Sequence, residues 1–145
     1  MSINEILFEK IKTVNDFLDA EKSGFTLKFK TTRPEMPGAT ILHEACRCCY
    51  IELIKFLVEE RGGDLSLRDE DECTPLGYIV NDDVMADFLS SGEFVTVNMG
   101  CDDSRQIFSA IEYLIEKNAP CVYCERDYSL QYVKNCLAKL KSSMR

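Results

Sequence analysis

Two kinds of segment are missing from this 145-residue sequence, and both absences bear on where the protein resides. The first residues, MSINEILFEKIK, lack the basic start, the long apolar block and the small-residue cleavage site of a secretory signal. No stretch approaches the roughly 18 uninterrupted apolar residues that a membrane span needs. We therefore expect an intracellular protein, cytoplasmic or nuclear, that has no membrane partner.

Motifs of catalysis are also scarce. His43 is the only histidine, although catalytic cysteines, catalytic serines and zinc sites commonly use histidine as a base or a ligand. The chain has no G-x-x-x-x-G-K-S/T phosphate loop, no G-x-G-x-x-G motif and no carboxylate pair in a recognisable catalytic context. The acidic run Asp69–Glu72 lacks the spaced ligands and the later glutamate of a calcium loop. We expect a protein that is not an enzyme and needs no cofactor.

What the sequence does contain is the composition of one globular domain. Hydrophobic residues make up 46% of the chain and charged residues 29%, which argues against wholesale disorder. The net charge of −8 is uneven, because basic and acidic groups number six and five in residues 1–33, four and sixteen in 34–103, and seven and four in 104–145. Nucleic acid binds basic surfaces, so the acidic middle is a poor site for it. That region would instead attract a basic protein surface.

The eight cysteines allow two interpretations. Because there is no secretory signal and several cysteines occupy apolar helical positions, we expect them to be reduced and mostly structural. An alternative from another class stays open, in which the chain is a zinc-dependent or thiol-redox protein. Its ligands would be Cys101, Cys121, Cys124 and Cys136. Cys121 and Cys124 form a Cys-x-x-Cys motif, and Cys46 and Cys49 have the same spacing within the central stretch.

Two patterns precede the middle of the chain. Residues 1–24 carry helix-start signals and apolar residues at helical spacing, which predicts a pair of short helices. Residues 25–37 break this period, because Phe25, Leu27 and Phe29 alternate with polar residues and two prolines follow. We interpret this stretch as a projecting hairpin or loop, either a plain connector or a contact arm.

The central stretch, residues 40–64, reads as a short helix, a turn, a longer helix and a glycine stop. The same sequence pattern begins again at Thr74 with TPLGY, 34 positions after Thr40. A unit that recurs at this period is typical of stacked helical repeats. The segment GATILHEAC, residues 38–46, resembles the G-x-T-P-L-H-x-A-A opening of an ankyrin repeat.

The resemblance weakens away from this stretch. Cys49 and Glu72 stand where ankyrin repeats usually have a glycine, and Gly77 stands where they usually have a histidine. The apolar helix of residues 104–118 leads into LIEKNA, which is similar to the L-L-E-K-G-A end of a repeat. A last helix is expected from about residue 128 to 142, with its lysines outward as a polar cap. Its inward residues are expected to be Leu130, Val133, Leu137 and Leu140.

The resemblance implies an all-α fold, namely an ankyrin-like α-solenoid of about four helix pairs with finger loops and divergent terminal caps. The expected segments are the helix pair 1–24, the loop 25–37, the repeats 38–69 and 70–98, the divergent repeat 99–120 and the capping helix 121–145. The second helix of repeat 70–98 is expected at Val84 to Ser90. The resemblance also implies that His43 is structural, with its ring hydrogen-bonded to the backbone of neighbouring turns.

For function, the resemblance implies a non-enzymatic module that binds a partner protein through finger tips and a concave face. The charge distribution favours a partner with a basic surface. The residues expected to contact it are Lys28, Lys30, Arg33, Glu70, Asp71 and Glu72 on loops, and Glu44, Arg47, Tyr78 and Asn81 at helix surface positions. Two alternatives stay open within the binding class: a small ankyrin-type inhibitor that imitates a transcription-factor inhibitor, and weak self-association through an uncapped end.

Overall fold

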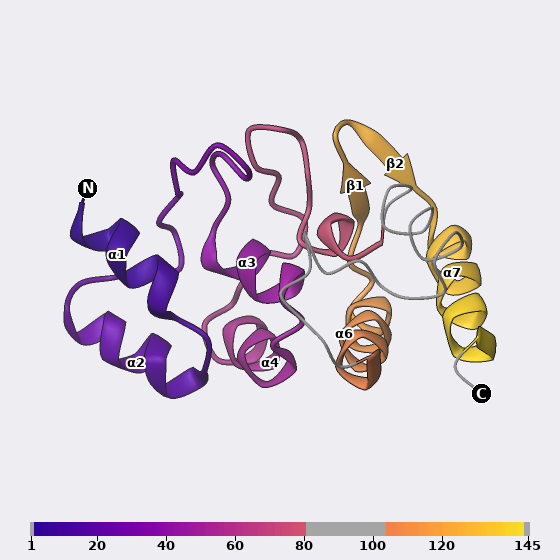
Figure 1. Ribbon diagram of the computed structural model, residues 1–145, viewed down its shortest axis with the longest axis horizontal. Helices are drawn as coiled ribbons and strands as arrows, with labels where there is room; N and C mark the ends of the chain where they lie inside the picture. The colour runs from indigo at the N-terminus through magenta and orange to yellow at the C-terminus, as the bar shows by residue number, and fades with distance from the viewer. Residues whose placement is uncertain (1, 81–103, 144–145) are drawn as a thin grey trace.

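The computed structural model describes residues 2–80 and 104–143, and Figure 1 shows their elements following one another along the long axis of the molecule. The chain runs from the N-terminal helices at one end to the last helix at the other (Figure 1). The elements are α1 (Ile3–Lys10), α2 (Val14–Lys22), α3 (Ile41–Arg47), α4 (Ile51–Glu59), the 3-10 helix η1 (Leu76–Tyr78), α6 (Ser104–Glu116), β1 (Cys121–Tyr123), β2 (Arg126–Tyr128) and α7 (Leu130–Ser143).

The first two helices begin where side chains satisfy free backbone N–H groups. The Ser2 hydroxyl accepts a hydrogen bond from the Glu5 N–H at 3.2 Å, at the start of α1. At the start of α2, Thr13 and Asp16 form a capping box, in which each side chain accepts from the backbone of the other. Both helices therefore form in the segment for which the sequence predicts a pair of short helices.

The loop after α2 contains no strand, although its aromatic residues alternate. The Phe25 N–H donates to the carbonyl of Ala20, and the Phe29 N–H donates to that of Thr26, so the backbone turns instead of extending. Phe25 is buried between two other rings, with centroid distances of 6.3 Å to Phe17 and 5.5 Å to Phe29. The alternation thus reflects burial of one side of an irregular loop.

Helices α3 and α4 form the centre of the molecule. All residues from Ile41 to Cys46 are buried, and α4 contributes the buried residues Leu53, Ile54 and Leu57. Helix α3 also contacts η1, while α4 contacts both α2 and α6. The core is therefore continuous from the N-terminal helices to α6.

The C-terminal segment differs from the expected capping helix in one respect. Its first residues form the antiparallel hairpin β1–β2, with Cys121 opposite Tyr128 and Tyr123 opposite Arg126. Helix α7 then begins at Leu130, because the Ser129 hydroxyl caps it by accepting from the Tyr132 N–H at 3.1 Å.

The inward face expected of α7 is correct only in part. Val133 is 1% exposed and Leu137 packs against the core, as the spacing predicts. Leu130 is 43% exposed, so its prediction as an inward residue is wrong. It lies in the first turn of the helix, directly after the hairpin.

The described residues are consistent with an all-α fold that carries one short hairpin. They contain the neighbouring pairs α1–α2 and α3–α4, whereas the helix expected at Val84–Ser90 lies outside them. None of the helices within 2–80 and 104–143 has both the length and the apolar composition to cross a membrane.

Candidate functional site

Three loops project from the same side of the molecule, each at a junction between helices (Figure 1). We name them finger 1 (residues 31–39, before α3), finger 2 (residues 67–74, before η1) and finger 3 (residues 121–128, the β1–β2 hairpin before α7). Together their outer residues make up the finger edge. The contacts that shape each finger decide which of its side chains are free to meet a partner.

Finger 1 is closed by backbone hydrogen bonds at its base. The Thr31 N–H donates to the carbonyl of Ala39 at 2.9 Å, and the Gly38 N–H donates to the carbonyl of Thr31 at 2.8 Å. The Glu5 carboxylate then fastens this finger to α1 by accepting from the Thr31 hydroxyl and the Thr32 N–H, both at 2.7 Å. Burial opposes ionisation of Glu5, but these hydrogen bonds prevail and lower the pKa of its carboxyl.

Arg33, on finger 1, is held by neighbours from two helices. One guanidinium nitrogen lies 3.1 Å from a Glu44 oxygen and another lies 3.2 Å from a Glu9 oxygen. The guanidinium carbon also lies 5.0 Å from the centre of the Phe8 ring. The other Glu44 oxygen accepts from Arg47 Nε at 2.6 Å.

Three residues expected to meet a partner are therefore joined to one another inside the molecule. Glu44 is buried, which contradicts its expected place on a helix surface, while the side chains of Arg33 and Arg47 are 20% and 24% exposed. Burial of Glu44 is tolerated because both of its carboxylate oxygens are paired with arginine. This cluster connects α1, finger 1 and α3.

His43 supports finger 2 from below. The Thr40 N–H donates to its Nδ1 at 3.1 Å, so Nε2 carries the proton of the neutral ring. Nε2 lies 3.0 Å from the carbonyl oxygen of Leu67 and 3.1 Å from that of Cys73, at the two ends of the finger. Burial lowers the pKa of the ring, which keeps it neutral. The predicted structural role of His43 is confirmed.

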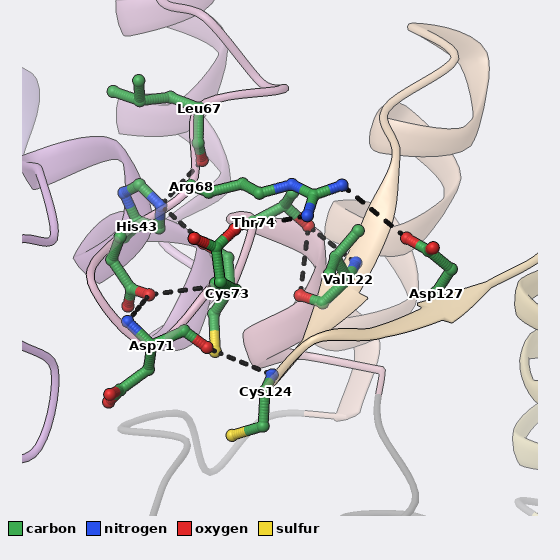
Figure 2. A network of polar contacts seen from close by, with 11 residues as sticks. His43, Leu67, Arg68, Asp71, Cys73, Thr74, Val122, Cys124 and Asp127 are labelled. Atoms are coloured by element: carbon green, nitrogen blue, oxygen red, sulfur yellow. Dashed lines mark hydrogen bonds and ion pairs between the residues drawn. The ribbon is translucent and has the colours of Figure 1, made fainter.

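The acidic run of finger 2 has an internal and an external part. One Asp69 oxygen accepts from the backbone N–H groups of Asp71 and Cys73 at 2.9 and 3.0 Å, and the other accepts from the Tyr78 hydroxyl. Asp69 is accordingly buried, whereas Glu70 and Asp71 are exposed. Figure 2 shows the Asp71 carboxylate directed away from the network around it.

Tyr78 is buried, and its expected place on a helix surface is wrong. It is 6% exposed, since its ring packs edge-on against His43 and Tyr123 and its hydroxyl is bound to Asp69. Burial, followed by the neighbouring Asp69 carboxylate, raises the pKa of the Tyr78 hydroxyl. Tyr78 thus fixes the acidic turn from inside the protein.

Fingers 1 and 2 touch each other directly. The Glu70 N–H donates to the carbonyl of Pro37 at 2.9 Å. Gly38 has a φ of +76°, and a Cβ there would lie 2.8 Å from Cγ of Glu70. A glycine is needed at this point because both the backbone conformation and the space exclude a side chain.

Fingers 2 and 3 are joined through Thr74, as Figure 2 shows. The Thr74 N–H donates to the carbonyl of Val122 at 2.9 Å, and the Val122 N–H donates back to the Thr74 hydroxyl oxygen at 3.0 Å. That hydroxyl in turn donates to the carbonyl of Pro120 at 2.8 Å.

Charged side chains add a second connection between the same two fingers. Arg68 lies 3.3 Å from Glu72, its neighbour on finger 2. It also lies 3.7 Å from Asp127 on finger 3, a pair that Figure 2 shows. Since these side chains are about half exposed or more, we expect each pair to stabilise the junction by no more than about 1 kcal/mol.

The remaining expected contact residues are Lys28, Lys30, Glu72 and Asn81. Lys28 and Lys30 are exposed on the loop that leads into finger 1. Glu72 is half-buried beside Arg68. Asn81 falls outside the described residues.

The cysteines of the zinc alternative are not all described, because Cys101 lies outside the two described ranges. Cys121 and Cys136 are buried, and the Cys121 thiol donates to the carbonyl of Val80 at 3.1 Å. Burial raises the pKa of the Cys121 thiol to about 12, which disfavours the thiolate that binds zinc. Within 2–80 and 104–143, no three potential ligands of histidine, cysteine, aspartate or glutamate gather.

Finger 3 is the part of the site that sequence reasoning missed. Its turn, Cys124-Glu125, has positive φ at both residues, the conformation that asparagine and glycine usually supply in a two-residue hairpin. The short runs Cys121–Tyr123 and Arg126–Tyr128 contain strand-forming residues, and this was the available signal. Without a favourable turn sequence between them, that signal is weak.

Comparison with known proteins bears on the centre of the molecule. Residues 37–67, which span the last residues of finger 1, α3 and α4, match the family model described as Ankyrin repeat. Neither the curated proteins nor the solved structures gave a match to the chain.

Proposed function

We propose that this chain, whose residues 37–67 match the ankyrin-repeat family model, is a protein–protein interaction module whose finger edge binds a basic surface of a partner protein. Ankyrin repeats generally bind proteins and are typically not enzymes. The choice of the finger edge and of a basic partner rests on the contacts and charges described above.

The observation that carries the proposal is that the three fingers are hydrogen-bonded in series. Glu70 connects finger 2 to finger 1, and Thr74 connects it to finger 3. A surface that is already ordered loses little conformational entropy on binding, so more of the contact energy appears as affinity. The same contacts keep the spacing of the exposed side chains constant.

The charge of the edge supports a basic partner. Its exposed acidic residues are Glu35 on finger 1, Glu70 and Asp71 on finger 2, and Glu125 and Asp127 on finger 3. Negative charges gathered on one edge speed the approach of a positive surface and make binding sensitive to salt. Lys28 and Lys30 lie beside this edge and would contact acidic groups of the same partner.

Residues that are paired within the protein have a supporting role in this proposal. Arg33, Glu44 and Arg47 hold finger 1 against α1 and α3, while Tyr78 holds Asp69. Their replacement would change binding through the shape of the edge, with a loss of stability. Replacement of Glu70 and Asp71 would remove exposed charge and leave the backbone hydrogen bond between Glu70 and Pro37 in place.

The proposal is tested with two variants of equal charge. Glu70→Ala/Asp71→Ala removes two exposed carboxylates from finger 2, and Glu52→Ala/Glu60→Ala, the α4 variant, removes one from the first turn of α4 and one from its C-cap. Each immobilised protein is used to capture partners from a cell lysate at low and at moderate salt, and the captured proteins are identified by mass spectrometry. A partner of the finger edge should be retained by wild type and by the α4 variant, and should be reduced at least tenfold on the finger variant.

The dependence on salt gives the second readout. Binding of the captured partner should weaken with salt, and the slope should be smaller for the finger variant because fewer charges take part. Equal capture by all three proteins, or a partner whose binding surface is acidic, would refute the proposed site.

A further inference from the structure

Cys73 and Cys124 meet where finger 2 contacts finger 3, although they are 51 positions apart in the sequence. The Cys124 N–H donates to the Cys73 sulfur at 3.2 Å. Figure 2 shows the Cys73 sulfur beside the Asp71 backbone and facing the backbone nitrogen of Cys124. Cys73 is 1% exposed, whereas Cys124 is exposed on the turn of the hairpin.

The backbone holds this arrangement in a costly conformation. Cys124 and Glu125 have φ values of 49° and 70°, which residues other than glycine rarely adopt in succession. The turn is fastened by the Cys124 N–H on the Cys73 sulfur and by the Glu125 N–H, which lies 3.5 Å from the carbonyl oxygen of Glu72. Finger 3 therefore presents Cys124 against Cys73, and rotation about one side-chain bond changes the separation of the two sulfur atoms.

We propose that Cys73 and Cys124 are an oxidation site, at which a peroxide converts the two thiols into a reversible disulfide that joins finger 2 to finger 3. The oxidant is a hydroperoxide such as hydrogen peroxide, and a dithiol reverses the reaction. The proposal rests on the geometry of the two fingers, and it stands whether or not the finger edge binds a basic partner.

The chemistry proceeds in two displacements. The Cys124 thiolate attacks one peroxide oxygen, so that an S–O bond forms, the O–O bond breaks and hydroxide leaves to become water; Cys124 is now a sulfenic acid. The Cys73 thiolate then attacks the Cys124 sulfur, so that an S–S bond forms, the S–O bond breaks and a second water leaves. The peroxide is reduced to two waters while two thiols lose two electrons and two protons.

Exposure assigns the order of the two steps. Among the cysteines in residues 2–80 and 104–143, Cys124 is exposed and the others are buried, so Cys124 meets the oxidant first. Burial, to which the neighbouring Cys124 thiol adds, raises the pKa of Cys73 to about 12, while the N–H of Cys124 acts in the opposite direction. The second displacement needs the Cys73 thiolate and should therefore be the slow one, faster by about tenfold for each unit of rising pH.

The test exposes the reduced full chain to hydrogen peroxide, blocks the remaining thiols and maps the peptides by mass spectrometry. The expected product is a Cys73–Cys124 linked peptide, with loss of two free thiols per chain and full recovery after dithiothreitol. The oxidised protein should also unfold at a higher temperature than the reduced protein, because the bond constrains the unfolded chain.

Three variants separate the proposed pair from other thiols. Cys124→Ser and Cys73→Ala should each abolish the linked peptide, and Cys73→Ala should leave Cys124 trapped as a sulfenic acid that a dimedone probe labels. The control variant Cys48→Ala, at the C-cap of α3, should form the linked peptide as wild type does. Should Cys73→Ala fail to fold, circular dichroism shows it, and Cys124→Ser on the surface hairpin still decides the question.

The opposite results are equally clear. Oxidation of Cys124 to a sulfinic acid without a linked peptide would overturn the proposal. A linkage of Cys124 to Cys101, or to a second copy of the chain, would overturn it as well.

Discussion

At the scale of single residues, one neutral histidine ring joins a helix to both ends of the next finger. His43 accepts from Thr40 and donates towards the carbonyls of Leu67 and Cys73. A protonated ring has no acceptor for the Thr40 N–H, and burial makes the charge costly. The stability of the protein should therefore depend on the protonation of this one residue.

The sign of this dependence follows from the lowered pKa. The unfolded ring titrates near its ordinary value of 6.5, and the folded ring titrates below it. Below 6.5 the unfolded chain binds more protons, so the free energy of unfolding should fall as the pH falls, by at most about 1.4 kcal/mol per pH unit. Above 6.5 the contribution of His43 is complete and constant.

Urea denaturation of wild type and of His43→Gln between pH 7.5 and about pH 5 measures this effect. The variant should be less stable at neutral pH, and the difference from wild type should shrink as the pH falls. A difference that stays constant over this range would show that His43 does not titrate on unfolding.

Two residues adopt a left-handed backbone conformation where the resembled repeat usually has glycine. Cys49 and Glu72 stand where glycine is usual in the resembled repeat, and their φ values are 57° and 61°. The backbone thus keeps the left-handed conformation of the turn although the side chain opposes it. The turn geometry is therefore kept at both positions without glycine.

At the scale of the elements, η1 and finger 3 pack closely because Gly77 of η1 has no side chain. A Cβ on Gly77 would lie 1.9 Å from the carbonyl oxygen of Val122 in β1. His43 of α3 reaches the next finger with its ring, whereas Gly77 lets β1 approach η1 directly. The hairpin can therefore lie against η1 only because Gly77 replaces the usual histidine.

Gly77→Ala should displace finger 3. The clash involves backbone atoms that cannot move alone, so we expect a loss of at least about 3 kcal/mol in the free energy of unfolding. Urea denaturation measures the loss, and hydrogen exchange should show faster exchange in residues 120–128.

Gly62→Ala is the matched control for this change. Gly62 has a φ of +65° and nothing within 4 Å of an added Cβ, so only the backbone preference opposes alanine. A cost of about 1–2 kcal/mol is expected there. Equal costs for the two variants would mean that the approach of β1 to η1 is loose in solution.

At the scale of the whole molecule, the fingers and their supporting ion pairs connect successive layers along the long axis. Arg33 connects α1 with α3, and Arg61 connects α4 with α2 through two hydrogen bonds to Glu21. The links made by Arg33 and Arg61 lie in the N-terminal half, where α1 exposes Ile3 and Ile6. The N-terminal helices are thus held to the central repeat by polar contacts as well as by their buried rings.

Arg33→Met should loosen this end of the molecule. It removes a charge-assisted hydrogen bond to buried Glu44, and we expect a cost of about 1.5–3 kcal/mol with faster hydrogen exchange in α1. Lys141→Met breaks the exposed pair with Glu112, 50% and 52% exposed, and should cost no more than about 1 kcal/mol. If both variants lost equal stability, the Arg33 cluster would have no special role.

The sequence by itself determined the features that depend on neighbours a few residues away. The cap at Ser2, the repeat from Thr40 and its restart at Thr74 follow from local spacing and capping, and the resemblance to an ankyrin repeat implied the structural role of His43. Their free energy comes from hydrogen bonds and burial within one helix pair or between successive ones. These features require no knowledge of the distant chain.

Only the tertiary structure decided which side chains are available and which segments form a common edge. Thr74 bonds to Val122, 48 positions later, and Arg33 is shared between two helices that its own position in the chain does not reveal. Tyr78 and Glu44 are buried for the same reason, since their partners come from other elements. Local patterns specify helices and turns, whereas the pairing of remote groups is set by how the layers pack.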